Sequence, residues 1–160
     1  MVTAVEFQKS EIDSIILQSV KKTLSDICHH LSERNPKYNW TGVYVVVGDN
    51  LKLVSFQGAA TEHVLIPLGE GLCSLAISRN ETVNEKDVKS NSEYLACFLN
   101  TKAELVVPVR YGDKPIGEID IDSDEKGAFD QDDEKFVEEI AEKISPLVKL
   151  IYDQNEKNPR

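Results

Sequence analysis

The stretch WTGVYVVVGDNLKLVSFQ, residues 40–57, decides the fold. It contains two runs rich in β-branched, aromatic and aliphatic residues, separated by the Gly-Asp-Asn segment 48–50. Runs of this composition favour β-strands, and a short segment of turn-forming residues between two of them is typical of a hairpin. Because side chains alternate along a strand, we expect Trp40 and Tyr44 on one face and the valines between and after them on the other. The stretch therefore predicts an antiparallel hairpin with one aromatic and one aliphatic face.

Outward from the hairpin, apolar periodicity predicts a helix at each end of the chain. Before Pro36, apolar residues recur every three or four positions: Ile16, Val20, Leu24, Ile27 and Leu31. After Phe129 and Asp130 a second stripe follows: Phe136, Ile140, Ile144, Leu147 and Ile151. This spacing is that of an amphipathic helix, and Asp130 is the expected N-cap of the second one.

The remaining elements complete an α+β fold. Strands are expected at 63–68, 82–84, 103–110 and 115–123, and a short helix at 72–80. This order predicts a mostly antiparallel sheet covered by helices from both termini. At 160 residues, the chain fits a single domain spanning 1–160.

Composition excludes several classes of partner. The net charge of −10 argues against nucleic acid and anionic membranes as partners. No apolar run approaches the roughly 20 residues of a membrane span. The first residues lack a basic region followed by an apolar stretch, so no signal peptide is expected and a cytoplasmic location is predicted.

The three cysteines differ in their surroundings. They are an odd number without C-x-x-C spacing, which predicts neither a secreted disulfide framework nor a metal site. Cys28 lies beside the first apolar stripe and is interpreted as a small residue near the core. Cys73 opens the short helix, where the helix dipole favours a thiolate. Cys97 lies in the polar segment 85–102, which is long enough to be a binding loop or lid, with disorder as the alternative.

An acidic strand follows the Cys97 segment. Alternation places Glu118, Asp120 and Asp122 on one face of residues 115–123. A solvated sheet face explains such a pattern without any function. Aspartate is depleted in strands, however, and two in one strand interior suggest that partners or a site are present. Both interpretations remain open on the pattern alone.

Four ordered motifs resemble those of a known family. They are N-W-x-G-x-Y from Asn39, G-x-G-x-C ending at Cys73, A-C ending at Cys97 and D-I-D-S from Asp120. Together they resemble GAF domains, and among these the free methionine-(R)-sulfoxide reductases. The resemblance covers about residues 35–150, with 39–150 as the family-like core and 1–34 as an N-terminal helix region. The 24-residue separation of Cys73 and Cys97 also fits.

The resemblance implies a fold, an activity and a site. The fold is a six-stranded antiparallel sheet with the terminal helices on one face and a ligand pocket on the other. The activity is reduction of free methionine-(R)-sulfoxide to methionine by a cysteine thiolate, through a sulfenic acid and a disulfide. Cys97 matches the nucleophile. The implied substrate-binding residues are Trp40, Tyr44, Glu104, Asp120 and Asp122.

The chain departs from the family pattern at His63, where the family commonly has a third cysteine. Cys73 is therefore the expected resolving residue. The resemblance implies no bound cofactor, with reducing equivalents from NADPH through a thioredoxin-like protein. GAF domains often pair through their terminal helices, so a homodimer is also expected. The alternative function is a non-catalytic GAF domain that binds a small molecule or senses redox state.

Overall fold

The computed structural model describes residues 1–94 and 100–157, and the predicted nucleophile Cys97 lies outside these ranges. The described residues contain one antiparallel sheet of six strands in the order β3-β2-β1-β6-β5-β4. The strands are β1 (Trp40–Val47), β2 (Asn50–Gln57), β3 (Leu65–Pro67), β4 (Val83–Glu85), β5 (Ala103–Tyr111) and β6 (Lys114–Ser123). The predicted α+β class and the six-stranded antiparallel sheet are confirmed.

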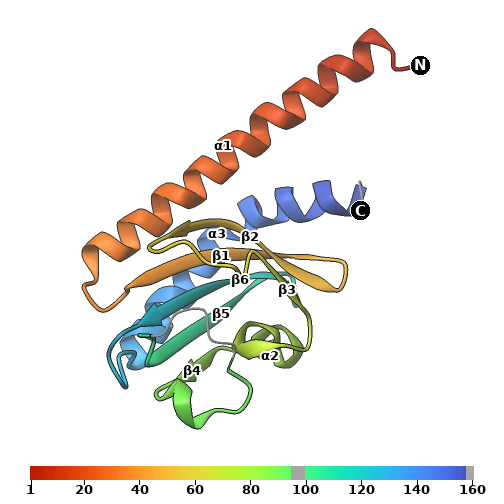
Figure 1. Cartoon of the computed structure of the whole chain (residues 1–160). Helices are drawn as coiled ribbons and strands as arrows, with labels where there is room; N and C mark the ends of the chain where they lie inside the picture. Colours follow the sequence, from red (N-terminus) through yellow and green to blue (C-terminus); the bar gives the residue numbers. More distant parts are fainter. Residues whose placement is uncertain (95–99, 158–160) are drawn as a thin grey trace.

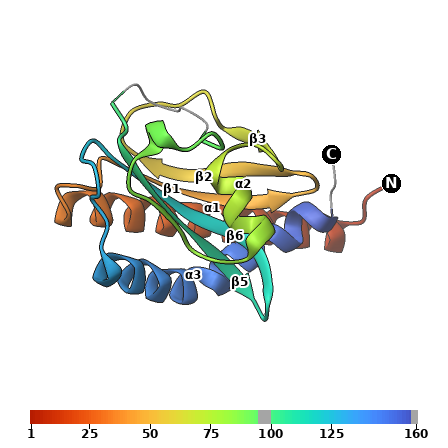
Figure 2. The ribbon, with the colours of Figure 1, turned by 90° about the horizontal axis from the view of Figure 1, so that it is seen from below.

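Helices cover both faces of the sheet, as Figures 1 and 2 show. The long terminal helices α1 (Ala4–Arg34) and α3 (Gln131–Lys157) lie together on one face, and the short α2 (Gly71–Arg79) packs on β5 and β6 from the other. A 3₁₀ turn, η1 (Val88–Ser90), lies within the segment that was expected to be a loop. None of the described helices combines the length and apolarity of a membrane span.

The hairpin prediction is confirmed, with a tighter turn than expected. Asn50 already belongs to β2 and pairs with Val47, so Gly48 and Asp49 alone connect the strands. Gly48 has a φ of 57°, in the left-handed region that glycine adopts without strain. The hairpin presents its aliphatic face to α1 and α3 and its aromatic face to α2.

The terminal helices begin at side-chain caps. Thr3 Oγ1 accepts a hydrogen bond from Glu6 N, and Glu6 Oε2 accepts one from Thr3 N. At α3, Asp130 Oδ1 accepts from Asp133 N and Asp133 Oδ2 accepts from Asp130 N, which confirms the predicted capping role of Asp130. These reciprocal pairs satisfy backbone N–H groups that the first helical turn leaves without partners.

The apolar stripes were placed correctly in part. Val20, Leu24 and Leu31 are buried as predicted, and Cys28 belongs to the same buried stripe rather than lying beside it. Ile16 is wrong as a core residue, because it is 41% exposed. The N-terminal part of α1 extends past the sheet, as Figure 1 shows. Phe136 is also wrong at 40% exposure, since Val137 takes the inward position on α3.

The main core lies between the sheet and the two terminal helices. The central strands contribute to it mainly aliphatic side chains, such as Val43, Val45, Leu105, Val107, Ile119 and Ile121. A smaller cluster lies under α2 and includes Trp40, Tyr44, Leu72, Cys73 and Val106. The two faces of the same sheet are therefore both buried, but the second one carries the polar residues predicted to bind substrate.

Candidate active site

Strand register brings the acidic residues together on the α2 face. Asp122 pairs with Trp40 of β1 and with Glu104 of β5, while Asp120 pairs with Gly42 and Val106. One pair further along, Glu118 lies between Tyr44 and Pro108. The sheet thus forms a floor in which the acidic side chains of β6 run between the aromatic residues of β1 and those of β5.

All four carboxyl groups of this floor are buried. The exposed fractions are 5% for Glu104, 0% for Glu118, 1% for Asp120 and 3% for Asp122. The alternative interpretation of β6 as a solvated polar face is therefore wrong. Burial of a carboxylate is unfavourable unless a partner compensates it, so a cluster of four marks a site rather than a structural core.

Helix α2 places Cys73 directly over the acidic floor. The Cys73 thiol donates a hydrogen bond to Asp120 Oδ2 at 3.4 Å. The sulfur of Cys73, one carboxyl oxygen of Glu104 and one of Asp120 all lie within 4.8 Å of one another. The helix is fixed at its far end, where Arg110 of β5 donates hydrogen bonds to the side chain and carbonyl of Asn80.

The electrostatics of the cluster oppose ionisation. Burial raises the pKa of Cys73 well above its ordinary value, and the neighbouring Asp120, Glu118 and Glu104 raise it further. This outweighs the helix dipole, so the expectation of a thiolate at Cys73 is wrong for this conformation. Burial likewise raises the pKa values of Glu118 and Asp122 well above the ordinary range.

Asp120 has the most polar surroundings of the cluster. Burial raises its pKa, whereas hydrogen bonds with Glu104 and Cys73 act in the opposite direction. Two carboxyl groups hydrogen-bonded to each other share a proton, because both cannot be ionised cheaply at this distance. The Glu104–Asp120 pair is therefore suited to hold a proton and to deliver it to a bound molecule.

Trp40 and Tyr44 form a fixed aromatic wall beside these acids. Trp40 Nε1 donates to Ala59 O at 3.0 Å, and the Tyr44 hydroxyl donates to His63 O at 2.8 Å. Their ring centroids are 6.5 Å apart, and Phe56 stacks on Trp40 from the other side at 5.9 Å. Gly42 leaves the space that the Trp40 ring fills, since a Cβ atom there would collide with the ring.

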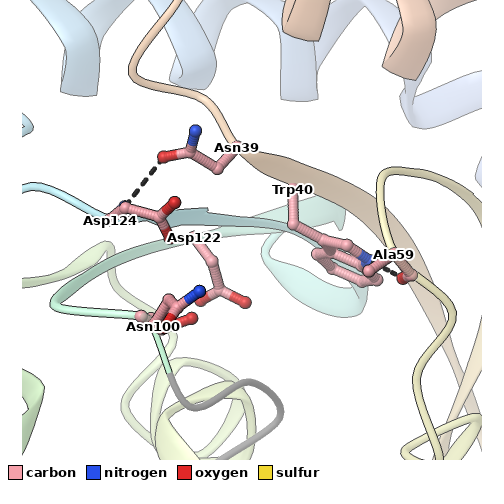
Figure 3. Close-up of a pocket in the computed structure, with 7 residues that line it drawn as sticks. Asn39, Trp40, Ala59, Asn100, Asp122 and Asp124 are labelled. Carbon is pink, nitrogen blue, oxygen red and sulfur yellow. Dashed lines mark hydrogen bonds between the residues drawn. The ribbon is translucent and has the colours of Figure 1, made fainter.

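A cavity of about 180 Å³ opens at the end of this wall. Figure 3 shows its lining, in which Trp40 and Asp122 border the same space. Asn39 closes one side, where its Oδ1 accepts a hydrogen bond from Asp124 N at 2.7 Å. Asn100 and Thr101, near the end of the segment that contains Cys97, also line the cavity. The cavity therefore adjoins a described residue only three positions after the predicted nucleophile in the sequence.

The predicted site residues separate into two groups. Trp40 and Asp122 line the cavity, while Cys73, Glu104 and Asp120 form the buried cluster, with Tyr44 at the inner end of the wall. Glu118 was not among the predicted site residues, although its pKa and its burial make it part of the cluster. Strand alternation placed it on the correct face, so that signal was available in the sequence.

Comparisons with known proteins identify the family of the chain. The sequence profile of the GAF domain matches residues 18–149. The chain is 32% identical to the free methionine-R-sulfoxide reductase of Escherichia coli over 79% of its own length and 76% of the relative's.

Two solved structures are similar over most of their length. A type II free methionine-R-sulfoxide reductase from Thermoplasma acidophilum is 53% identical, with a TM-score of 0.82 over 83% of this chain and 94% of that one. The enzyme from Neisseria meningitidis, solved with its substrate, is 28% identical, with a TM-score of 0.77 over 88% of this chain and 86% of that one. The chain therefore belongs to the GAF domain family, and within it to the free methionine-R-sulfoxide reductases.

Proposed function

We propose that this protein reduces free L-methionine-(R)-sulfoxide to methionine. The observation that carries the proposal is the buried cluster of Cys73, Glu104 and Asp120 beside an aromatic wall. It occurs in a chain 53% identical to a reductase of this kind. A thiol, a proton-holding carboxyl pair and a cation-binding acidic floor are the groups that this reaction needs.

The acidic floor accounts for recognition of the free amino acid. An ammonium group gains charge-assisted hydrogen bonds from buried carboxylates and neutralises part of their charge. Asp122 lines the cavity, and Glu104 pairs with it across the two strands. A methionine residue within a protein has an amide in place of the ammonium and so lacks this interaction. Trp40 and Tyr44 suit the S-methyl group, because sulfur-bearing groups pack favourably against aromatic rings.

In the first chemical step, the thiolate of Cys97 attacks the sulfoxide sulfur. The carboxyl pair Glu104–Asp120 supplies a proton to the sulfoxide oxygen, which leaves the substrate sulfur and becomes bonded to the cysteine sulfur. Methionine departs, and Cys97 is oxidised to a sulfenic acid. The sulfur of Cys97 donates both electrons and takes up the oxygen atom, so this step needs no bound cofactor.

In the second step, Cys73 resolves the sulfenic acid. Its sulfur attacks the Cys97 sulfur, the sulfenic hydroxyl leaves as water, and a disulfide forms. Attack requires loss of the Cys73 proton, and Asp120 Oδ2 already accepts a hydrogen bond from that thiol. A thioredoxin-like dithiol, itself reduced through NADPH, returns both cysteines to thiols. Cys73 thus resolves the sulfenic acid, a role that the family resemblance assigns to a third cysteine at the position of His63.

The test is a coupled assay of NADPH oxidation with thioredoxin, its reductase and each epimer of free methionine sulfoxide. We expect turnover of the R epimer only, complete loss in Cys97→Ser, and full activity in the matched variant Cys28→Ser. In Cys73→Ser we expect one equivalent of methionine per chain without further turnover. Absence of methionine from the wild-type protein, together with stabilisation by a bound amino acid, would instead establish a non-catalytic binding domain.

We also propose a homodimer in a reducing compartment such as the cytoplasm. The first half of α1 exposes several large apolar residues, namely Val5, Phe7, Ile12, Ile15 and Ile16, which a second copy could cover. Cys28 and Cys73 are free thiols, as expected where glutathione and thioredoxin keep cysteines reduced. Light scattering on the wild type and on Ile12→Glu tests the dimer, since a charge at its centre would leave monomers.

A further inference from the structure

The acidic floor holds more negative groups than one substrate ammonium can neutralise. Glu118, Asp120 and Asp122 are all at least nine-tenths buried, and none of the ion pairs found among residues 1–94 and 100–157 includes them. Charges in this environment must bind protons or a cation. The cluster also contains a thiol, which an ammonium site does not need.

Several carboxyl oxygens of the floor lack a hydrogen bond within the described part of the chain. Both oxygens of Glu118, Oδ1 of Asp120 and Oδ1 of Asp122 accept none of normal geometry. Buried polar atoms in native proteins nearly always have partners, so each exception calls for an explanation such as a bound ion. Asp120 lies beside the thiol of Cys73, which indicates the kind of ion.

The distances within the cluster match a small tetrahedral metal site. A zinc ion with bonds of about 2.3 Å to sulfur and about 2.0–2.2 Å to oxygen separates a sulfur and an oxygen ligand by about 3.5 Å. The separation of Cys73 Sγ and Asp120 Oδ2 is 3.4 Å. Glu104 adds a third ligand atom within 4.8 Å of both, and rotation of its side chain toward the other two would bring it to the separation of about 3.4 Å that a shared zinc ion requires.

We propose that Cys73, Glu104 and Asp120 form a binding site for a thiophilic divalent cation, with Zn²⁺ as the best fit. The three protein ligands leave a fourth position for an exchangeable ligand, and Glu118 adds negative charge behind them. A thiolate ligand selects zinc over Mg²⁺ and Ca²⁺, which prefer oxygen ligands alone. This site goes beyond the proposed reductase function, and sequence spacing did not predict it.

Zinc at this site prevents both roles proposed for the cluster. It occupies the carboxylates that hold the substrate and the proton, and it binds the sulfur of Cys73 that would resolve the sulfenic acid. The cation is therefore a reversible inhibitor that competes with methionine sulfoxide. This consequence rests on the proposed function, whereas the binding site itself does not.

The test is a titration of the reduced, metal-free full chain with Co²⁺, which occupies zinc sites and reports a thiolate ligand by a near-ultraviolet charge-transfer band. We expect one equivalent of Co²⁺ to produce the band and Zn²⁺ to displace it, while Mg²⁺ and Ca²⁺ leave it unchanged. The band is lost in Cys73→Ser but kept in Cys28→Ser and Cys97→Ser. Glu104→Gln and Asp120→Asn each weaken Co²⁺ binding by at least about tenfold.

A band that survives in Cys73→Ser, or that disappears in Cys97→Ser, overturns the proposed ligand set. Circular dichroism and thermal unfolding of each variant show that it is folded, so a lost band reports a lost ligand. A second arm measures the effect of Zn²⁺ on methionine release, where we expect inhibition that excess substrate relieves. Turnover without a cobalt band refutes the metal site alone, while a cobalt band without turnover in metal-free protein refutes the reductase alone.

Discussion

The two faces of β6 are equally buried and have opposite chemistry. Along β6, Ile119 and Ile121 point into the apolar core under α1 and α3, while Glu118 and Asp120 point under α2. All four are at most 1% exposed. The same backbone thus carries one layer that stabilises the fold and another whose burial is unfavourable for folding. Along β6, alternate residues therefore serve different purposes: one set stabilises the fold and the other forms the site.

The largest expected effect comes from neutralising the acidic face. Asp120→Asn removes the proton-holding carboxyl pair and the acceptor of the Cys73 thiol proton. We expect kcat/KM for free methionine-(R)-sulfoxide to fall by about a hundredfold or more, the usual range for loss of an acid–base group. Because the substitution also removes a buried charge, the free energy of unfolding in urea should not decrease. The exposed turn variant Asp113→Asn is the matched control, and equal activity of the two variants would contradict the role of Asp120.

The neighbouring residue on the other face should show the reverse pattern. Ile119→Ala leaves a cavity in the main core and should lower the free energy of unfolding by about 3 kcal/mol. Ile119→Val, which removes one methyl group, should lower it by about 1 kcal/mol. At temperatures where the variants are folded, kcat should match the wild type. A fall in kcat without a fall in stability would mean that the faces are not independent.

A third substitution tests whether burial of the acidic face is unfavourable for folding. Glu118 is fully buried, and among the described residues neither of its oxygens accepts a hydrogen bond of normal geometry. Glu118→Met keeps the volume and removes the buried carboxyl group, so we expect the free energy of unfolding at neutral pH to rise by about 1–3 kcal/mol. Glu125→Met at an exposed position should change it by less than about 0.5 kcal/mol. Destabilisation by Glu118→Met would show that this carboxyl has a compensating partner.

The sequence predicted the layers well because strand alternation is a local property. Period two placed Trp40 and Tyr44 opposite the hairpin valines, and it placed Asp120 opposite Ile119, as the structure confirms. The helix faces were predicted less accurately, because the exposure of apolar residues on α1, such as Ile12 and Ile16, depends on which part of the helix the sheet covers. The spacing of apolar residues within a helix does not show which part of that helix the sheet covers.

The site itself depends on contacts between distant segments. Cys73, Glu104 and Asp120 come from α2, β5 and β6, so their spacing in the chain shows no metal-ligand or catalytic pattern. The burial that raises the pKa of Cys73 also arises from tertiary packing. The helix dipole, which alone favours a thiolate at Cys73, does not include this effect. The role of Cys97 stays a prediction from the resemblance, since it lies outside the described residues.

The smallest expected effect concerns a partly buried carboxylate that has partners. Asp133, at the start of α3, accepts hydrogen bonds from Lys37 at 2.6 Å and from the Tyr38 hydroxyl at 2.7 Å. Burial acts against the charge, but these bonds and those from Asp130 hold the pKa of Asp133 below its ordinary value. The group therefore stabilises the fold above the pKa that it has in the unfolded chain, and this stabilisation is lost as pH falls through the folded-state pKa.

Asp133→Asn should accordingly lower the free energy of unfolding by about 1 kcal/mol at neutral pH, a modest value because solvent partly screens the Lys37 pair. Urea unfolding at a series of pH values should show the gap between wild type and variant closing as the solution becomes strongly acidic. A gap independent of pH would mean that the capping hydrogen bonds stabilise the fold without help from the charge. In that case, the contrast with Glu118 would reflect the presence of hydrogen-bond partners rather than compensation of charge.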